Sequence, residues 1–129
     1  MVEKSLKGSE TILLVDDEEF IRNSGKELLT RFGYAILTAA DGEIALDICR
    51  EKPGEIDLVI MDLLMPGMGG KKCLKEILLI NPLAKIVLAS GYSPDGMASE
   101  AADIGAKGFI GKPYQVNELL TLIREVLDH

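Results

Sequence analysis

Histidine and cysteine are scarce in this chain. The single histidine among 129 residues is His129, the last residue, where a frayed end is expected. The sequence therefore offers no internal histidine for general acid–base catalysis. Cys49 and Cys73 match no metal-binding spacing and fall among apolar residues of predicted helices. We interpret them as free buried thiols in a reducing cytoplasm.

Positive charge and long apolar runs are also scarce. Lysine and arginine number 14 against 21 acidic residues, for a net charge of -7. Because phosphate contacts need clustered basic side chains, we expect no nucleic-acid binding by this domain. No apolar run approaches the roughly 20 residues of a membrane span, and no signal peptide is visible, so we expect no membrane contact. The G-x-x-x-x-G-K-[ST] sequence is absent, which excludes nucleotide hydrolysis of the P-loop kind.

Apolar residues, in contrast, are abundant. They make up 47% of the chain, and 129 residues suffice for one domain with a sizeable core. Residues 1–10 mix Lys, Glu, Ser and Gly without periodicity, which predicts a flexible N-terminal segment. The domain itself is expected at 11–129.

Short apolar runs alternate with amphipathic stretches along this domain. The runs predict strands at 11–15, 34–39, 56–64, 85–89 and 107–110. The amphipathic stretches predict helices at 18–32, from the Asp41 cap to the Pro53-Gly54 break, and at 71–80, 93–105 and 115–127. Inward-facing residues are expected at Phe20, Ile21, Leu28, Leu29, Ile44, Ala45, Leu46, Ile48, Leu74, Ile77, Leu78, Val116, Leu119, Leu120, Ile123, Val126 and Leu127.

Five strands alternating with five helices predict an α/β fold. The short connections favour a parallel sheet with helices on both faces. Right-handed crossovers leave few topologies, and the common five-strand arrangement is the flavodoxin-like, doubly wound order 2-1-3-4-5. Ligands then bind at the carboxyl ends of the strands, at the switch point between the first and third strands.

Polar residues follow the predicted strands where that binding edge should lie. Asp16 and Asp17 follow the first strand, Asp62 lies near the end of the third, Ser90 follows the fourth and Lys112 follows the fifth. Three neighbouring carboxylates repel one another, so such a site needs a cation or raised pKa values. Mg²⁺ suits it, because this ion takes one or two carboxylates and accepts phosphate oxygens. An aspartate can also accept a phosphoryl group, whose charge an ammonium and a hydroxyl would stabilise.

With these residues in this order, the chain resembles the receiver domain of bacterial two-component signalling proteins. The resemblance extends from Thr11 to Leu127. It is carried by four motifs in order: the run Ile12-Leu13-Leu14-Val15-Asp16-Asp17-Glu18, Asp62 with Met65-Pro66-Gly67, Ser90-Gly91, and Phe109 three residues before Lys112-Pro113. The opening 8–17 also resembles receivers fused to the C-terminus of hybrid sensor histidine kinases. The chain is then a fragment of a longer protein or, alternatively, a stand-alone regulator.

The resemblance implies roles for the acidic residues and the lysine. Asp62 would be the phosphoacceptor. Asp17, Asp62 and the backbone carbonyl of Leu64 would bind Mg²⁺, with Asp16 helping through water. Lys112 would pair with the phosphoryl group.

The resemblance also implies how the domain switches. The Lys112-Pro113 bond is typically cis in the family. Ser90 and Phe109 would be the switch pair, Ser90 moving to the phosphoryl oxygens and Phe109 turning into the vacated space. The surface made by the fourth helix, fifth strand and fifth helix would carry the signal.

The leading hypothesis is therefore a phosphorylation-switched signalling module rather than an enzyme. A histidine kinase or phosphotransfer protein would donate the phosphoryl group, and a homodimer is a further expected partner state. Leu64 and Tyr92 flank the phosphoryl position in receivers and orient water poorly, which predicts slow self-dephosphorylation. A Mg²⁺-dependent phosphohydrolase with Asp62 as nucleophile is the alternative, although Leu64 stands where a second acid would be needed. A receiver-like module that only binds partners is a third hypothesis.

Overall fold

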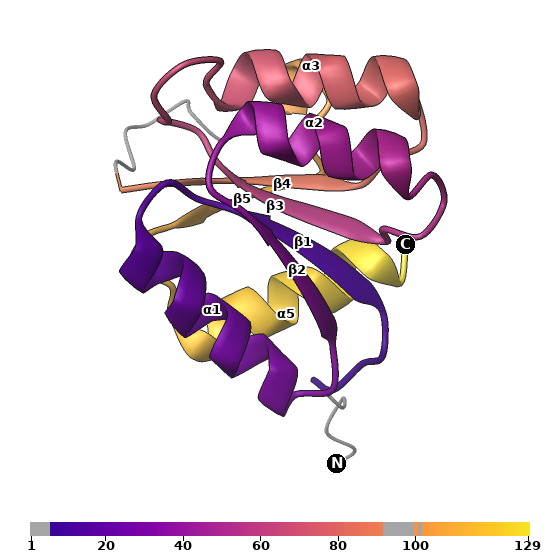
Figure 1. Cartoon of the computed structure of the whole chain (residues 1–129). Helices are drawn as coiled ribbons and strands as arrows, with labels where there is room; N and C mark the ends of the chain where they lie inside the picture. The colour runs from indigo at the N-terminus through magenta and orange to yellow at the C-terminus, as the bar shows by residue number, and fades with distance from the viewer. Residues whose placement is uncertain (1–5, 92–99, 101) are drawn as a thin grey trace.

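A five-stranded parallel sheet forms the centre of the molecule. The computed structural model describes residues 6–91, 100 and 102–129. The strands lie in the order β2-β1-β3-β4-β5, so the predicted topology is confirmed (Figure 1). Their bounds are β1 Thr11–Val15, β2 Ala35–Ala39, β3 Leu58–Asp62, β4 Ile86–Ser90 and β5 Gly108–Gly111.

Helices cover both faces of the sheet (Figure 1). Their bounds in the described part of the chain are α1 Glu19–Arg31, α2 Gly42–Glu51, α3 Gly70–Ile80 and α5 Val116–Leu127. The helix predicted at 93–105 falls mostly outside the described residues, of which 100, 102 and 103 are helical. Within the part of the chain that is described, no helix has the length and apolarity needed to cross a bilayer.

The fully apolar strands are explained by burial on two faces. Successive side chains of a strand point to opposite faces. Accordingly, Leu13 and Val15 of β1 enter a core cluster with residues of α2 and α3. Ile12 and Leu14 enter a second cluster with residues of α1 and α5. A strand covered by helices on both faces therefore has no position for a polar residue until it ends.

Three of the side chains expected to face inward are instead exposed. Phe20 is 79% exposed, Ile44 42% and Val116 46%. In α1 the buried positions are Gly25 and Leu29, one turn apart, and Phe20 does not lie on that line. In α2 the buried positions Gly42, Ala45 and Leu46 likewise leave Ile44 on the outer side, whereas Val116 is the first residue of α5.

The described part of the N-terminal segment lies against the domain. The Gly8 amide donates to the Phe32 carbonyl at 3.0 Å, and the Ala35 amide donates to the Glu10 carbonyl at 3.0 Å. Leu6 packs against the second core cluster. The division into a flexible segment 1–10 and a domain 11–129 remains a prediction, but the contacts with the domain begin before Thr11.

Candidate functional site

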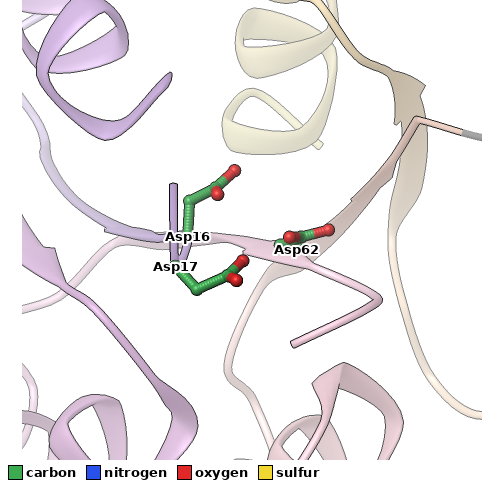
Figure 2. Close-up of side chains that lie close together, drawn as sticks. All are labelled: Asp16, Asp17 and Asp62. Atoms are coloured by element: carbon green, nitrogen blue, oxygen red, sulfur yellow. The ribbon is translucent and has the colours of Figure 1, made fainter. Parts of the chain in front are cut away.

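Three aspartates meet at the carboxyl edge of the sheet. Asp16 follows β1 and its amide donates to the Ala39 carbonyl at 3.1 Å, which extends the strand pairing by one residue. Asp62 is the last residue of β3. Each of these three aspartates, Asp16, Asp17 and Asp62, has one carboxylate oxygen that lies within 4.8 Å of a carboxylate oxygen of each of the other two. Figure 2 shows the three side chains together. The predicted convergence on the switch point between β1 and β3 is thus present.

The three carboxylates differ in their exposure to solvent. Asp16 is 0% and Asp62 3% exposed, whereas Asp17 lies at the surface. The Asp16 carboxylate accepts a hydrogen bond from the Glu18 amide at 2.9 Å. The Asp62 carboxylate accepts one from the Leu64 amide at 3.3 Å. The backbone therefore fixes two of the acids, and the third faces water at the mouth of the site.

Lys112 supplies a buried positive charge beside these acids. Its Nζ lies 3.0 Å from Asp16 Oδ2 and 3.1 Å from Asp62 Oδ2, and its side chain is only 8% exposed. The Lys112 amide donates to the Ser90 carbonyl at 2.8 Å, which ties the loop after β5 to the end of β4. Burial alone would lower the pKa of Lys112, but its hydrogen bonds to the two aspartates raise it. The lysine is therefore charged.

The charged form of Asp62 is nevertheless disfavoured by its surroundings. Burial raises the pKa of Asp62 to about 6, although Lys112 acts in the opposite direction and Asp16 adds to the rise. One ammonium thus offsets only part of the negative charge. The oxygen-only ligand set suits a hard divalent cation, which would offset the remainder. The residues present therefore fit Mg²⁺.

Ser90 lies on β4, which neighbours β3, and Phe109 lies on β5, which neighbours β4. Ser90 ends β4, is 1% exposed and follows Ala89, the residue paired with Asp62. Phe109 of β5 is half-buried against the first core cluster. The Lys112-Pro113 bond is cis, as predicted. The prediction for Tyr92 lies outside the described residues.

Two residues near the site were missed by the sequence reasoning. Glu18 Oε1 lies 3.8 Å from Lys112 Nζ, and its place directly after Asp16 and Asp17 could have signalled this. The Tyr114 hydroxyl is buried and has no hydrogen-bond partner among the described residues. Burial first, and then the charges of Asp16 and Asp62, raise the pKa of Tyr114. No sequence pattern distinguishes this inward ring from a surface tyrosine.

The arrangement combines a nucleophile with the means to stabilise a phosphoryl group. A carboxylate such as that of Asp62 can act as a nucleophile, and an ammonium such as that of Lys112 can stabilise phosphoryl oxygens. The acids can hold the cation that such chemistry uses. The one histidine of the sequence, His129, is the last residue, and its carbonyl accepts a hydrogen bond from Lys85, which precedes β4 at the opposite edge of the sheet.

Comparison with known proteins agrees with this chemistry. The model of the response regulator receiver domain family matches residues 12–124. The sensor kinase CckA of Brucella abortus is 39% identical over 129 residues, which are 98% of this chain and 14% of that protein. The chain thus spans about a seventh of that relative. The chemotaxis protein CheY of Thermotoga maritima is 38% identical over 117 residues, covering 89% of this chain and 95% of CheY.

Solved structures lead to the same family. The CheX–CheY–BeF3–Mg²⁺ complex from Borrelia burgdorferi contains a chain that superposes with a TM-score of 0.87 at 31% identity, over 91% of this chain and 88% of that one. The comparisons give no support to a phosphohydrolase. The chain belongs to the response regulator receiver domains of two-component systems, which are phosphorylation-switched signalling domains.

Proposed function

We propose that Asp62 is the phosphoacceptor of this receiver. The position of Lys112 carries the proposal, because one ammonium bonds both the Asp62 and the Asp16 carboxylates in a buried setting. A phosphoryl group on Asp62 would find that ammonium within reach of its oxygens. Ser90, at the end of the neighbouring strand, would supply a hydroxyl.

Mg²⁺ is the cofactor in this proposal. Asp17, Asp62 and the Leu64 carbonyl would hold the ion, and Asp16 would help through water. When bound, it neutralises charge on the phosphoryl oxygens. The fit of an oxygen-only, incompletely neutralised acidic cluster supports this assignment.

The phosphoryl donor is a phosphohistidine on a histidine kinase or a phosphotransfer protein. In the transfer, an Asp62 carboxylate oxygen forms a P–O bond as the P–N bond to the imidazole breaks, and the imidazole leaves with its electron pair and is protonated by solvent. The similarity to a sensor kinase and to CheY supports a two-component donor. The chain supplies the acceptor and the charge stabilisation, so it assists its own phosphorylation.

Phosphorylation then acts through Ser90 and Phe109. A phosphate adds a charge of about -2 near neutral pH, which pulls donors toward Asp62. Phe109 lines a shallow surface depression with residues of α5, including Asn117 and Leu122. A rotation of the Phe109 ring would therefore alter the surface made by β5, α5 and the helix predicted at 93–105. This surface would contact output partners or a second copy of the chain.

Slow self-dephosphorylation and a cytoplasmic location complete the proposal. Leu64 is 56% exposed beside Asp62 and has no group that orients an attacking water. The free thiols of Cys49 and Cys73 suit a reducing compartment.

Phosphorylation by a small donor tests the acceptor assignment. The chain is incubated with acetyl phosphate and Mg²⁺, and its intact mass is measured alongside Asp62→Asn and the matched surface variant Asp47→Asn. We expect the mass increment of one phosphate in the wild type and in Asp47→Asn, and none in Asp62→Asn. Many turnovers of free phosphate would indicate a phosphohydrolase instead. A wild type without any adduct would indicate a module that only binds partners.

A further inference from the structure

Residues 6–10 form a strap at the amino edge of the sheet, opposite the aspartate site. The Gly8 amide bonds the Phe32 carbonyl, and the Glu10 carbonyl accepts from the Ala35 amide, each at 3.0 Å. The Tyr34 hydroxyl donates to the Leu6 carbonyl at 3.4 Å. The strap is thus bound along its length by backbone groups as well as side chains.

Arg124 of α5 clamps this strap. Its Nη1 and Nη2 donate to Glu10 Oε1 and Oε2 at 2.8 and 2.9 Å, a two-point pairing of guanidinium and carboxylate. Nη1 also donates to the Tyr34 hydroxyl at 3.2 Å. The Arg124 side chain is only 15% exposed. The pairing of Arg124 with Glu10 joins residues 114 positions apart in the sequence.

The strap fits its site closely. A Cβ on Gly8 would lie 2.4 Å from both Arg124 Nη1 and Tyr34 Cε1. A Cβ on Gly33 would lie 2.3 Å from the Gly8 carbonyl oxygen, and Gly33 has a φ of +100°. A side chain at position 8 therefore cannot be accommodated unless Arg124 or Tyr34 moves.

Arg124 has a second carboxylate partner besides Glu10, which allows the strap to be released. Arg124 Nη2 also donates at 2.6 Å to Oδ1 of Asp128, the C-cap residue of the same helix. If the strap leaves, Arg124 keeps this partner, and no buried charge is left unpaired. Glu10 is already 28% exposed and would be hydrated. The cost of release is therefore mainly the exposure of Leu6 and Tyr34.

One helix connects the clamp to the aspartate site. α5 begins at Val116, four residues after Lys112, and Arg124 lies about 12 Å further along the helix at 1.5 Å per residue. Its buried face, including Leu120 and Ile123, packs in the same core cluster as Leu6 and Tyr34. A movement of the Lys112 loop that shifts α5 would therefore also displace Arg124.

We propose that the strap is a releasable element whose attachment to α5 is coupled to the occupancy of Asp62. The inference rests on the proposed phosphoacceptor role. The attached strap belongs to the state in which Lys112 bonds Asp16 and Asp62. When the phosphoryl group draws Lys112 away, the strap is loosened, and any polypeptide joined to it receives the signal at the edge opposite the phosphate.

Linkage provides the test, because coupling between two sites is reciprocal. Beryllium trifluoride with Mg²⁺ serves as the phosphoryl analogue, and its uptake is followed by fluorine NMR over a concentration series. We expect Glu10→Gln to tighten the apparent binding of the analogue about fivefold, at the lower end of typical couplings. Gly8→Ala should do the same without a change of charge. In the wild type, the analogue should speed hydrogen exchange at the Gly8 amide.

A matched variant separates coupling from a general charge effect. Asp47→Asn removes the same charge from an exposed pair with Arg50 on α2, which packs against the other face of the sheet, and should leave both readouts unchanged. If the wild type takes up the analogue but Glu10→Gln, Gly8→Ala and the Gly8 exchange rate show no response, the coupling is refuted while the acceptor role stands. If the wild type takes up neither the analogue nor phosphate, both proposals fail.

Discussion

Two buried cations hold acidic groups at opposite edges of the same sheet. At the carboxyl edge, Lys112 bonds Asp16 and Asp62, with Asp17 close by. At the amino edge, Arg124 bonds Glu10 and Asp128. Each cluster therefore has one positive side chain and at least two acidic ones. The two clusters nevertheless shift the pKa of a carboxyl group in opposite directions.

The difference lies in burial. Hydrogen bonds from Arg124 lower the pKa of Glu10, whose side chain keeps contact with water. Burial raises the pKa of Asp62 to about 6, despite Lys112. The amino-edge cluster therefore stabilises the fold, whereas the carboxyl-edge cluster leaves an incompletely neutralised carboxylate at Asp62. Strongly perturbed acids of this second kind are typical of functional sites.

Removing Lys112 should have the largest effect on function. Lys112→Ala leaves Asp62 without the charge that stabilises phosphoryl oxygens, and we expect phosphorylation by acetyl phosphate to slow about 10²–10³-fold. The initial rate of adduct formation, followed by intact mass in the presence of Mg²⁺, measures this. Lys85→Ala, which removes a lysine bonded to C-terminal carbonyls, is the control and should react at the wild-type rate. A wild-type rate in Lys112→Ala would show that the lysine is structural only.

Removing Arg124 should affect stability instead. Arg124→Ala takes the guanidinium from both Glu10 and Asp128 and leaves a gap beside Tyr34, so we expect the free energy of unfolding to fall by about 2–3 kcal/mol. Urea unfolding measures the change. Arg31→Ala breaks an exposed pair and should cost well under about 1 kcal/mol. The phosphorylated fraction of folded Arg124→Ala should not fall. A lower fraction would contradict the assignment of the amino-edge cluster to stability alone.

Removing the charge of Asp62 should stabilise the protein when no divalent cation is added. A carboxyl group whose folded pKa lies above its unfolded value destabilises the fold at pH values above both. We expect Asp62→Asn to raise the free energy of unfolding by about 1–2 kcal/mol at pH 7 in EDTA. Mg²⁺ should then stabilise the wild type, and not Asp62→Asn, in urea unfolding. A destabilised Asp62→Asn would place Asp62 with the structural acids.

The carboxyl-edge cluster could be predicted from sequence because it follows from the fold class. Apolar runs that end in polar residues mark where buried strands stop, and in a parallel sheet those ends share one edge. Asp16, Asp62 and Lys112 come together for that reason. The same logic did not place Phe20, since an apolar residue near a helix start does not by itself reveal which side of the helix faces the core.

The amino-edge cluster could not be predicted in this way. Residues 6–10 have no periodicity, and Glu10 and Arg124 are 114 positions apart. Their pairing depends on where α5 ends relative to the start of β1, which is a property of the packed domain. A charged residue on a predicted helix is ordinarily assigned to its solvated side, and Arg124 is largely buried.

The pH dependence of stability should separate the two edges, with the smallest effect of the series. The folded pKa of Glu10 is lowered from 4.5, so its contribution is present above that pH and is lost as the pH falls through the folded pKa. In urea unfolding between pH 5 and pH 3, we expect the free energy of unfolding of the wild type to fall by about 1 kcal/mol relative to that of Glu10→Gln, a typical value for a partly exposed pair.

Asp62 acts with the opposite sign, because its raised pKa makes the fold gain stability as the pH falls from about 6 toward 3.8. Since Glu10→Gln retains Asp62, the difference between the two proteins isolates the amino edge. Equal slopes below pH 5 would mean that Arg124 gains nothing from Glu10 beyond what Asp128 already provides.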